Sequence, residues 1–217
     1  MRSREVVRYF LVGLLGFLVG AFIGADLGDS LLYKIERYFL SRQEILASYF
    51  ADLDQDGATE HILVRRIKFP SRHYYSECFL EIYRESEKLW QSESLGMHLK
   101  AITLSDLNGD QRKEVITKWE DVTTQSLNIC AIDKNGIKEV FSGQGKDVLL
   151  FDIDKDGIQE IVEYQRDYDK PFIHFNAALY RWDGERYSLL RNEVPVANDR
   201  RGRNMLILGK GNVVVLR

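Results

Sequence analysis

The sequence has few of the features by which common enzymes and nucleic-acid-binding proteins are recognised. Its four histidines have no zinc-like spacing, and neither HExxH nor GxSxG occurs. A glycine-rich phosphate loop and a dinucleotide fingerprint are also absent. The net charge is −3, with both signs mixed along the 217 residues, so nothing indicates a nucleic-acid partner. We therefore expect a protein that is not an enzyme and does not bind nucleic acid.

Cysteine is also scarce, since only Cys78 and Cys130 occur. They do not fall at matching positions of the repeat described below, so no disulfide is evident from the sequence. A location outside the cytoplasm would permit their oxidation, and their pairing is left open.

What the chain does contain is an acidic nine-residue pattern in three copies: loop 1 (residues 52–60), loop 2 (106–114) and loop 3 (152–160). Each copy has carboxylate or amide oxygens at positions 1, 3 and 5 and a glutamate at position 9. Side chains two apart on a tightly turning loop can converge on one point. Five or more hard oxygens at one point suit calcium.

The residues around each loop distinguish between two kinds of calcium site. An EF-hand has helices on both sides, an apolar residue at position 8 and a glutamate at position 12. Here position 8 is Thr59, Lys113 or Gln159, and only loop 3 has an acid, Glu163, at position 12. The flanking runs are short and rich in β-branched and aromatic residues, for example 47–51 and 62–64. They predict a strand, a loop and a second strand.

The spacing of the loops predicts a repeated unit of about four short strands. The loops start at residues 52, 106 and 152, and a second hairpin is expected after each loop hairpin. Asn135-Gly136 and Asp183-Gly184 are strong hairpin signals in the second and third units. We predict units at 45–96, 97–143 and 144–195 and a half unit at 196–217. Strand pairs repeated at this period are typical of propeller blades.

These residues resemble FG-GAP repeats, also called VCBS repeats, of the integrin alpha N-terminal type, and the resemblance covers residues 45–217. It implies an all-β, propeller-like stack of about three to four antiparallel blades, in which the Asp-x-Asp-x-Asp-Gly loop joins two strands and binds calcium. By residue matching, it implies these ligand candidates: Asp52, Asp54, Asp56 and Glu60; Asp106, Asn108, Asp110 and Glu114; Asp152, Asp154, Asp156 and Glu160.

The chain departs from the family pattern at two positions. Position 9 is often aspartate in the family and is glutamate here, so it either ligates metal or ties the loop to backbone amides. Loop 2 has Gln111 at position 6, where the other loops have glycine; because positive φ is costly for a residue with a Cβ, Gly109 is a candidate to shift the turn. The alternative for all three loops is a network of Asx turns without metal.

The N-terminus predicts a membrane anchor. Residues 6–25 are apolar except for Arg8, and twenty helical residues span one hydrocarbon core. We expect residues 1–5 in the cytoplasm, a single-pass anchor at 6–25, a connector helix at 26–44 extending to Leu46, and the β domain outside the cytoplasm. Gly16, Gly20 and Gly24 share one helix face, which suits a helix partner. A cleaved signal peptide, giving a secreted protein, is the alternative.

Three and a half units are too few for a seven-bladed ring, so the stack is open, truncated or completed by partners. We expect a membrane-anchored, calcium-stabilised module for adhesion, ligand capture or complex assembly. The aromatic segments 69–75 and 167–172 suit a protein or carbohydrate ligand. The alternatives are an accessory domain of a polysaccharide-processing enzyme and the input domain of a sensor.

Overall fold

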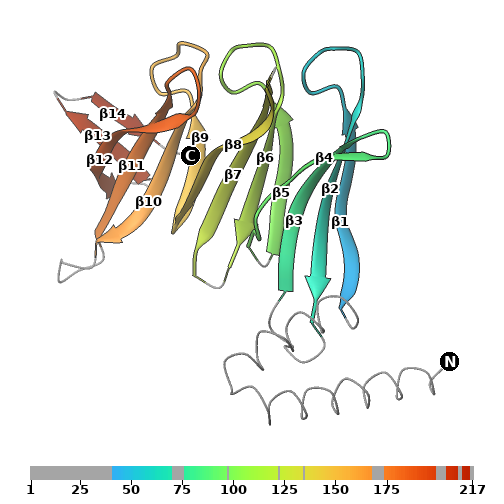
Figure 1. Ribbon diagram of the computed structural model, residues 1–217. Coiled ribbons are helices and arrows are strands. Elements are labelled where there is room, and N and C mark those ends of the chain that lie inside the picture. The colour runs from blue at the N-terminus through green and yellow to red at the C-terminus, as the bar shows by residue number, and fades with distance from the viewer. Residues whose placement is uncertain are drawn as a thin grey trace, which may run out of the picture.

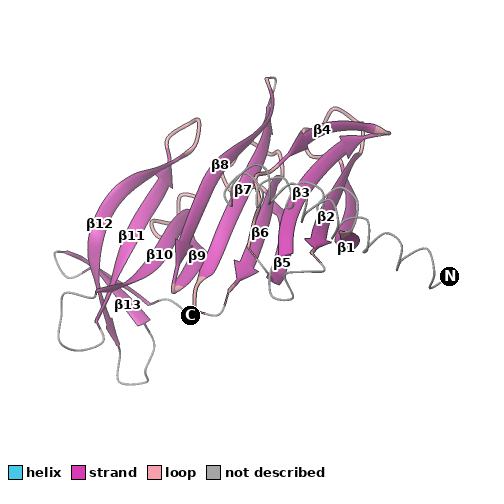
Figure 2. Ribbon diagram, turned by 60° about the horizontal axis from the view of Figure 1, so that its bottom comes forward, coloured by secondary structure: helices cyan, strands magenta, loops and turns pink. Residues whose placement is uncertain are grey.

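The structure is a computed structural model that describes residues 41–69, 76–96, 98–121, 123–133, 135–167, 174–198, 204–209 and 212–215. These residues form fourteen strands and no helix, as Figure 2 shows by colour. The prediction of an all-β fold is therefore confirmed for the described part of the chain, and strands on both sides of each acidic loop exclude the EF-hand.

The strands form three sheets in which every neighbouring pair is antiparallel, and none of the sheets closes on itself. The first contains β1 (Arg42–Ala51), β2 (Glu60–Lys68), β3 (Ser76–Arg84) and β4 (Glu87–Gln91). The second contains β5 (His98–Ser105), β6 (Glu114–Glu120), β7 (Gln125–Asp133) and β8 (Gly136–Gly145). The third contains β9 (Asp147–Phe151), β10 (Glu160–Asp167), β11 (His174–Trp182) and β12 (Tyr187–Asn198), extended by the hairpin of β13 (Asn204–Gly209) and β14 (Asn212–Val215).

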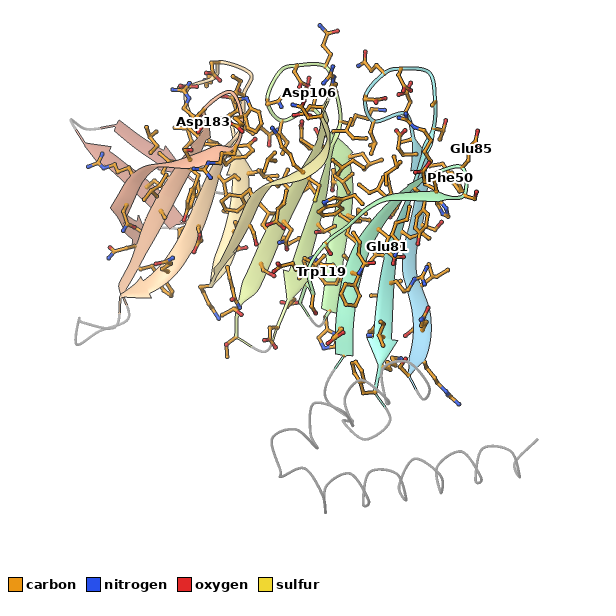
Figure 3. All side chains as sticks on the ribbon, viewed as in Figure 1. Phe50, Glu81, Glu85, Asp106, Trp119 and Asp183 are labelled. Atoms are coloured by element: carbon orange, nitrogen blue, oxygen red, sulfur yellow. The ribbon has the colours of Figure 1, made fainter. Side chains whose placement is uncertain are left out.

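The three sheets stand side by side (Figure 1), and apolar side chains fill the space between the first and second sheets. Because side chains alternate along a strand, Ile62 and Val64 of β2 lie on one face, where they pack with Val115 and Trp119 of β6. Trp119 is fully buried, and its indole N–H donates to Thr117 Oγ1 at 3.0 Å. Figure 3 shows it among the strands of the stack.

The opposite face of the second sheet packs against the third sheet in the same way. Ile116 and Ile129 of the second sheet lie in one buried cluster with Ile161 and Tyr187 of the third. The second sheet is thus buried on both faces, which accounts for the near-continuous burial of β7. The stack is held by apolar contacts between sheets rather than by shared strands.

The N-terminal edge of the first sheet corrects one prediction. β1 begins at Arg42, so residues 42–44 of the predicted connector helix, and the continuation of its helical spacing to Leu46, lie in a strand. The residues pair with β2 instead, and Glu44 lies 2.7 Å from Arg66 and 2.8 Å from Lys68. Glu44 and its neighbours form a strand that these cross-strand ion pairs stabilise. Partners on β2 therefore outweigh the helical spacing of this segment.

The remaining N-terminal predictions lie outside the described residues. They comprise the cytoplasmic end at 1–5, the anchor at 6–25, the helix face of Gly16, Gly20 and Gly24, and the rest of the connector helix. Within the part that the structure describes, no helix is long and apolar enough to cross a membrane.

The two cysteines lie in one buried cluster between the first and second sheets, and no disulfide joins them. Burial raises the pKa of Cys78 to about 11 and that of Cys130 well above its ordinary value. Both thiols are therefore protonated at neutral pH and act as small apolar core residues.

Candidate metal centre

The three acidic loops share one backbone conformation, with positive φ at positions 4 and 6. The residues in this conformation are Gln55 and Gly57 in loop 1, Gly109 and Gln111 in loop 2, and Lys155 and Gly157 in loop 3. Gly109 was a candidate to shift the turn of loop 2, but the turn is not shifted. Loop 2 carries its glycine at position 4 instead of position 6, and Gln111 adopts a φ of 70°. Each loop thus holds one residue with a Cβ in the left-handed region.

Replacing Gln111 with glycine is expected to raise the free energy of unfolding by about 0.5–1 kcal/mol, because left-handed strain exceeds the entropy that glycine adds. Gly57→Ala is the converse control. Its added Cβ meets no atom within 4 Å, so only the backbone at φ 87° opposes it, and we expect a loss of about 1 kcal/mol. Urea unfolding measures the free energy of unfolding of both variants. A Gln111→Gly protein less stable than wild type would show that position 6 of loop 2 is not strained as described.

The side-chain oxygens hold each loop through its own backbone amides, and in loops 1 and 3 each side chain uses one oxygen for this. The position 9 glutamate accepts the N–H of position 2: Leu53 to Glu60 at 3.0 Å, Leu107 to Glu114 at 2.8 Å and Ile153 to Glu160 at 2.8 Å. Positions 1, 3 and 5 accept the N–H groups of positions 6, 5 and 7 in all three loops. The Asx-turn network is therefore present, and glutamate serves it with Oε2 only.

In loops 1 and 3 three of the carboxylates also converge. Asp52, Asp54 and Glu60 offer oxygens that all lie within 4.8 Å of one another, and Asp152, Asp154 and Glu160 do the same. Asp52 Oδ1 and Asp152 Oδ1 are buried and have no hydrogen-bond partner. Asp56 and Asp156 are outside these compact groups. Two of the three predicted loops thus form acidic clusters that can hold a metal ion.

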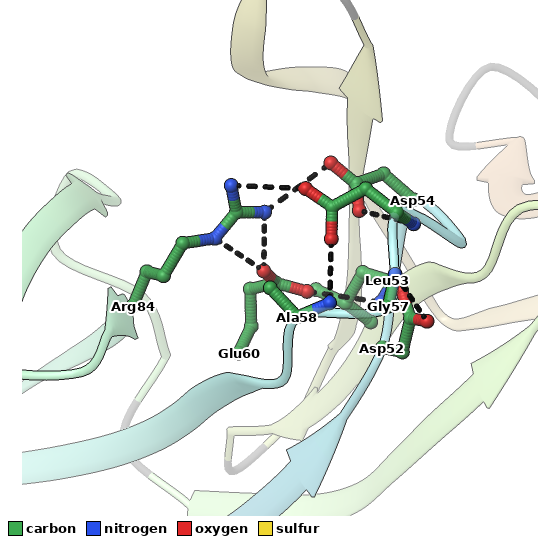
Figure 4. Close-up of polar contacts among 8 residues, drawn as sticks. Asp52, Leu53, Asp54, Gly57, Ala58, Glu60 and Arg84 are labelled. Atoms are coloured by element: carbon green, nitrogen blue, oxygen red, sulfur yellow. Dashed lines mark hydrogen bonds and ion pairs between the residues drawn. The ribbon is translucent and has the colours of Figure 1, made fainter.

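Two arginines that sequence reasoning missed lie in these clusters. Arg84, at the end of β3, contacts Asp54 at 3.3 Å, Asp56 at 3.1 Å and Glu60 at 2.5 Å (Figure 4). Arg181 of β11 contacts Asp154 at 2.8 Å, Asp156 at 2.5 Å and Glu160 at 3.5 Å. The bond to Glu60 raises the pKa of Arg84, and the bond to Asp156 raises that of Arg181.

The signal for these arginines lies in the strand register. Arg84 is the cross-strand partner of Glu60, and Arg181 stands one residue beyond the Ile161–Tyr180 pair. In both units a tyrosine precedes the arginine, as Tyr83-Arg84 and Tyr180-Arg181. An alignment of the second hairpins to the position 9 glutamate would therefore have found them.

Loop 2 is built differently at its centre. Cys130 of β7 pairs with Val115, so Ala131 lies opposite Glu114, at the position that arginine takes in the other two units. Asn108 Nδ2 donates to Glu114 Oε1 at 3.1 Å, in the place that a guanidinium takes in the other loops. Both oxygens of Asp106 accept backbone N–H groups, from Gly109 at 2.7 Å and Gln111 at 2.8 Å. The predicted ligands Asp106, Asn108, Asp110 and Glu114 thus do not leave the same set of spare oxygens.

Glu114 is 1% exposed and has no cationic partner within the described part of the chain. The pKa of Glu114 is raised to about 7, chiefly by burial; the Leu107 N–H opposes this rise, and the charges of Asp110 and Asp106 contribute to it. Between about pH 4.5 and 7 the Glu114 carboxyl is thus protonated in the folded protein and ionised in the unfolded chain. Stability from this group is therefore greatest at low pH and is lost as pH rises through 7.

The pH dependence is testable with Glu114→Gln in the presence of a chelator. Wild type is expected to lose about 2–3 kcal/mol from this group between pH 5 and pH 8. The stability difference, wild type minus variant, should shrink by that amount over the same range. Glu120→Gln, at an exposed site on β6, is the control and should show a constant difference. A constant difference for Glu114→Gln as well would contradict the assignment.

Neighbouring loops are joined to one another. The N–H of Lys113 in loop 2 donates to the Leu53 carbonyl of loop 1 at 3.0 Å, and the N–H of Gln159 in loop 3 donates to the Leu107 carbonyl of loop 2 at 2.9 Å. Position 8 of loops 2 and 3 thus bonds position 2 of the preceding loop. The loops form a row along one edge of the stack, at the top of Figure 1.

A groove lies between the second and third sheets. It measures about 430 Å³ and is lined by β8 and by residues of β11, β12 and the turn before β12: Glu139, Val140, Phe141, Ser142, Tyr180, Arg186, Tyr187, Ser188 and Leu189. The aromatic segments predicted as a ligand surface lie largely outside the described residues, at 70–75 and 168–173. Within the described residues, the groove is one surface that combines aromatic and charged side chains.

No protein-family model and no curated protein matches the sequence. Similar solved structures are rhamnogalacturonan lyase PL11 of Bacillus licheniformis (15% identity, TM-score 0.42), rhamnogalacturonan lyase YesW (16%, 0.41) and exotype rhamnogalacturonan lyase YesX (16%, 0.41). Each match covers 78% of this chain and 39–40% of the other. The chain thus spans less than half the length of these structures, and likeness at this level assigns no activity to it.

Proposed function

We propose that this chain is a calcium-stabilised module for binding or complex assembly, built from FG-GAP-type repeats as part of a propeller-like stack. In this proposal residues 6–25 anchor it to a membrane and the sheets stand outside the cytoplasm. The observation that carries the proposal is the row of acidic loops. Two of the loops present convergent carboxylate oxygens, and backbone bonds join all three.

The donor set of loops 1 and 3 fits calcium. In loop 1 the oxygens not used by the loop backbone are Asp52 Oδ1, Asp54 Oδ2, Asp56 Oδ2 and Glu60 Oε1, and loop 3 repeats the set. Calcium takes six to eight oxygen ligands and accepts water among them. The buried Asp52 Oδ1 and Asp152 Oδ1 would then gain the partner that they lack.

A calcium ion would supply positive charge where carboxylates gather. The chain's own residues do the rest: Oδ1 of positions 3 and 5 and Oε2 of position 9 fix the loop backbone, and the amide of position 8 ties each loop to its neighbour. Metal at one loop would therefore stiffen the edge at which the sheets meet. A fixed stack is what a binding or assembly surface requires.

The groove between the second and third sheets supports ligand binding as the function of the module. Phe141, Tyr180 and Tyr187 line it together with Arg186 and Glu139. Aromatic rings beside a few polar groups suit a carbohydrate or a protein segment. The same observation favours the second candidate, an accessory domain that holds polysaccharide for a separate catalytic unit.

The test is thermal unfolding of the full-length protein in detergent, with chelator and with rising calcium. Calcium at 100 times its Kd is expected to add about 2.7 kcal/mol per site, because a ligand of the folded state stabilises it. The double variant Asp52→Asn, Asp152→Asn should lose the response, and Asp106→Asn should keep it. An unchanged melting temperature of wild type at saturating calcium would remove the proposal.

A further inference from the structure

The strongest unexplained feature of the stack is the pair of arginines inside the acidic loops. Arg84 and Arg181 come from the third strand of their sheets and not from the loops. Each guanidinium contacts three carboxylates at once. Arg84 and Arg181 are 35% and 39% exposed, so both have room to leave towards solvent.

The oxygens that each arginine occupies are those left over by the loop backbone. Arg84 contacts Asp54 Oδ2, Asp56 Oδ2 and Glu60 Oε1, whereas Oδ1, Oδ1 and Oε2 of the same groups accept backbone N–H groups. Arg181 makes the same division in loop 3. A metal ion would need the same spare oxygens, so guanidinium and metal cannot both hold them.

We infer that Arg84 and Arg181 are built-in competitors of the metal, which set the calcium affinity of loops 1 and 3 and neutralise these loops when calcium is absent. The inference rests on the proposed calcium site. Calcium binding then replaces the guanidinium with a calcium ion at loops 1 and 3, and the arginine side chain moves outward into solvent. Because the cluster is never left without a counterion, the folded state persists across a range of calcium concentrations.

One oxygen in each cluster stands apart from this exchange. Asp52 Oδ1 and Asp152 Oδ1 are buried, have no partner, and are not reached by the arginines. A guanidinium therefore leaves one carboxylate oxygen of each loop unsatisfied, whereas an ion at the centre can use it. This difference gives calcium its advantage over the arginine at sufficient concentration.

Loop 2 is the internal comparison. Ala131 replaces the arginine, an amide nitrogen of Asn108 faces Glu114, and Asp106 has no spare oxygen. It is closed without a cation and has no competitor to remove. The expected stoichiometry for loops 1–3 is therefore two calcium ions.

The experiment is isothermal titration of calcium into full-length protein in detergent, for wild type, Arg84→Gln, Arg181→Gln and the double variant. Each substitution is expected to lower the Kd of its own loop by about tenfold or more, since one competing charge is removed. Without calcium, each variant should also melt several degrees lower, and saturating calcium should restore most of that loss.

Arg65→Gln is the matched control. Arg65 lies 3.0 Å from the buried Glu81 on the first sheet, away from the loops, so its loss lowers the melting temperature without changing the calcium Kd. Arg84→Lys keeps the charge but cannot bridge three carboxylates, and serves if Arg84→Gln does not fold. Its Kd is expected to lie between those of wild type and Arg84→Gln.

The outcomes separate the inference from the proposed function. Calcium binding by wild type with the same Kd in Arg84→Gln, Arg181→Gln and Arg84→Lys overturns the inference and leaves the calcium site standing. Binding by the variants alone removes the proposed function and overturns the exchange as well, because the arginines would then keep calcium out of the native loops. An absence of binding in every folded protein removes the calcium site and the competition together.

Discussion

Glu60→Ala is expected to lower the free energy of unfolding by about 3 kcal/mol in the absence of calcium, which is the low end for removing one partner of a buried ion pair. Glu60 is fully buried and joins two elements. Its Oε2 accepts the Leu53 N–H, and its Oε1 accepts from Arg84. The variant leaves a buried amide and a guanidinium short of partners. The low end applies because Arg84 is one-third exposed and solvent replaces part of the loss.

Urea unfolding with chelator measures this effect. Glu120→Ala is the matched control, because Glu120 is half exposed and lies 3.4 Å from an exposed lysine; we expect a change within about 0.5 kcal/mol. Glu60→Gln should fall between the two, since it keeps an acceptor for Leu53 but loses the charge. A Glu60→Ala protein as stable as Glu120→Ala would show that the loop does not depend on its ninth residue.

Trp119→Ala is expected to cost about 3–5 kcal/mol, which is the range for removing a large aromatic side chain from a core. Trp119 lies between the first and second sheets with Ile62, Val64 and Leu80 around it. Its surroundings are tight, since a Cβ added at Gly96 would lie 2.9 Å from the Trp119 Cβ. The variant should loosen the contact between two sheets rather than the pairing within either sheet.

Trp90→Ala is the control for Trp119→Ala. Trp90 packs at the margin of the same cluster and is only partly buried, so Trp90→Ala should lower the free energy of unfolding by less than Trp119→Ala does. Hydrogen exchange adds a readout: amides of β2 and β6 should lose protection in Trp119→Ala before those of β10. Equal losses in the two tryptophan variants would mean that the sheets are not held together through this cluster.

The sequence carried enough to predict the strands and the loops that join them, because both depend on local patterns. Alternating β-branched residues around loops 1–3 specified strands, and Asn135-Gly136 and Asp183-Gly184 marked hairpins that lie between β7 and β8 and between β11 and β12. Local pattern failed at Arg42–Leu46, where helical spacing gave way to pairing with β2. There, partners distant in sequence determined the structure.

The candidate site divides in the same way. Its carboxylates were predictable, because the Asp-x-Asp-x-Asp spacing places them on one loop. Arg84 and Arg181 were missed, because each reaches its loop through strand pairing across 24 and 21 residues from Glu60 and Glu160, and only an alignment of the second hairpins indicates them. The conformation of Gln111 was missed for another reason: the bonds of Asp106 and the neighbouring loop hold it at positive φ, and a lone sequence shows only the strain.

A crystal structure of the protein grown in calcium, with anomalous data to identify the ion, is the most direct measurement. We expect an anomalous peak among Asp52, Asp54 and Glu60 and a second among Asp152, Asp154 and Glu160, with both guanidinium groups turned away. A structure at saturating calcium with no peak, and with Arg84 and Arg181 still bridging three carboxylates each, would contradict this expectation.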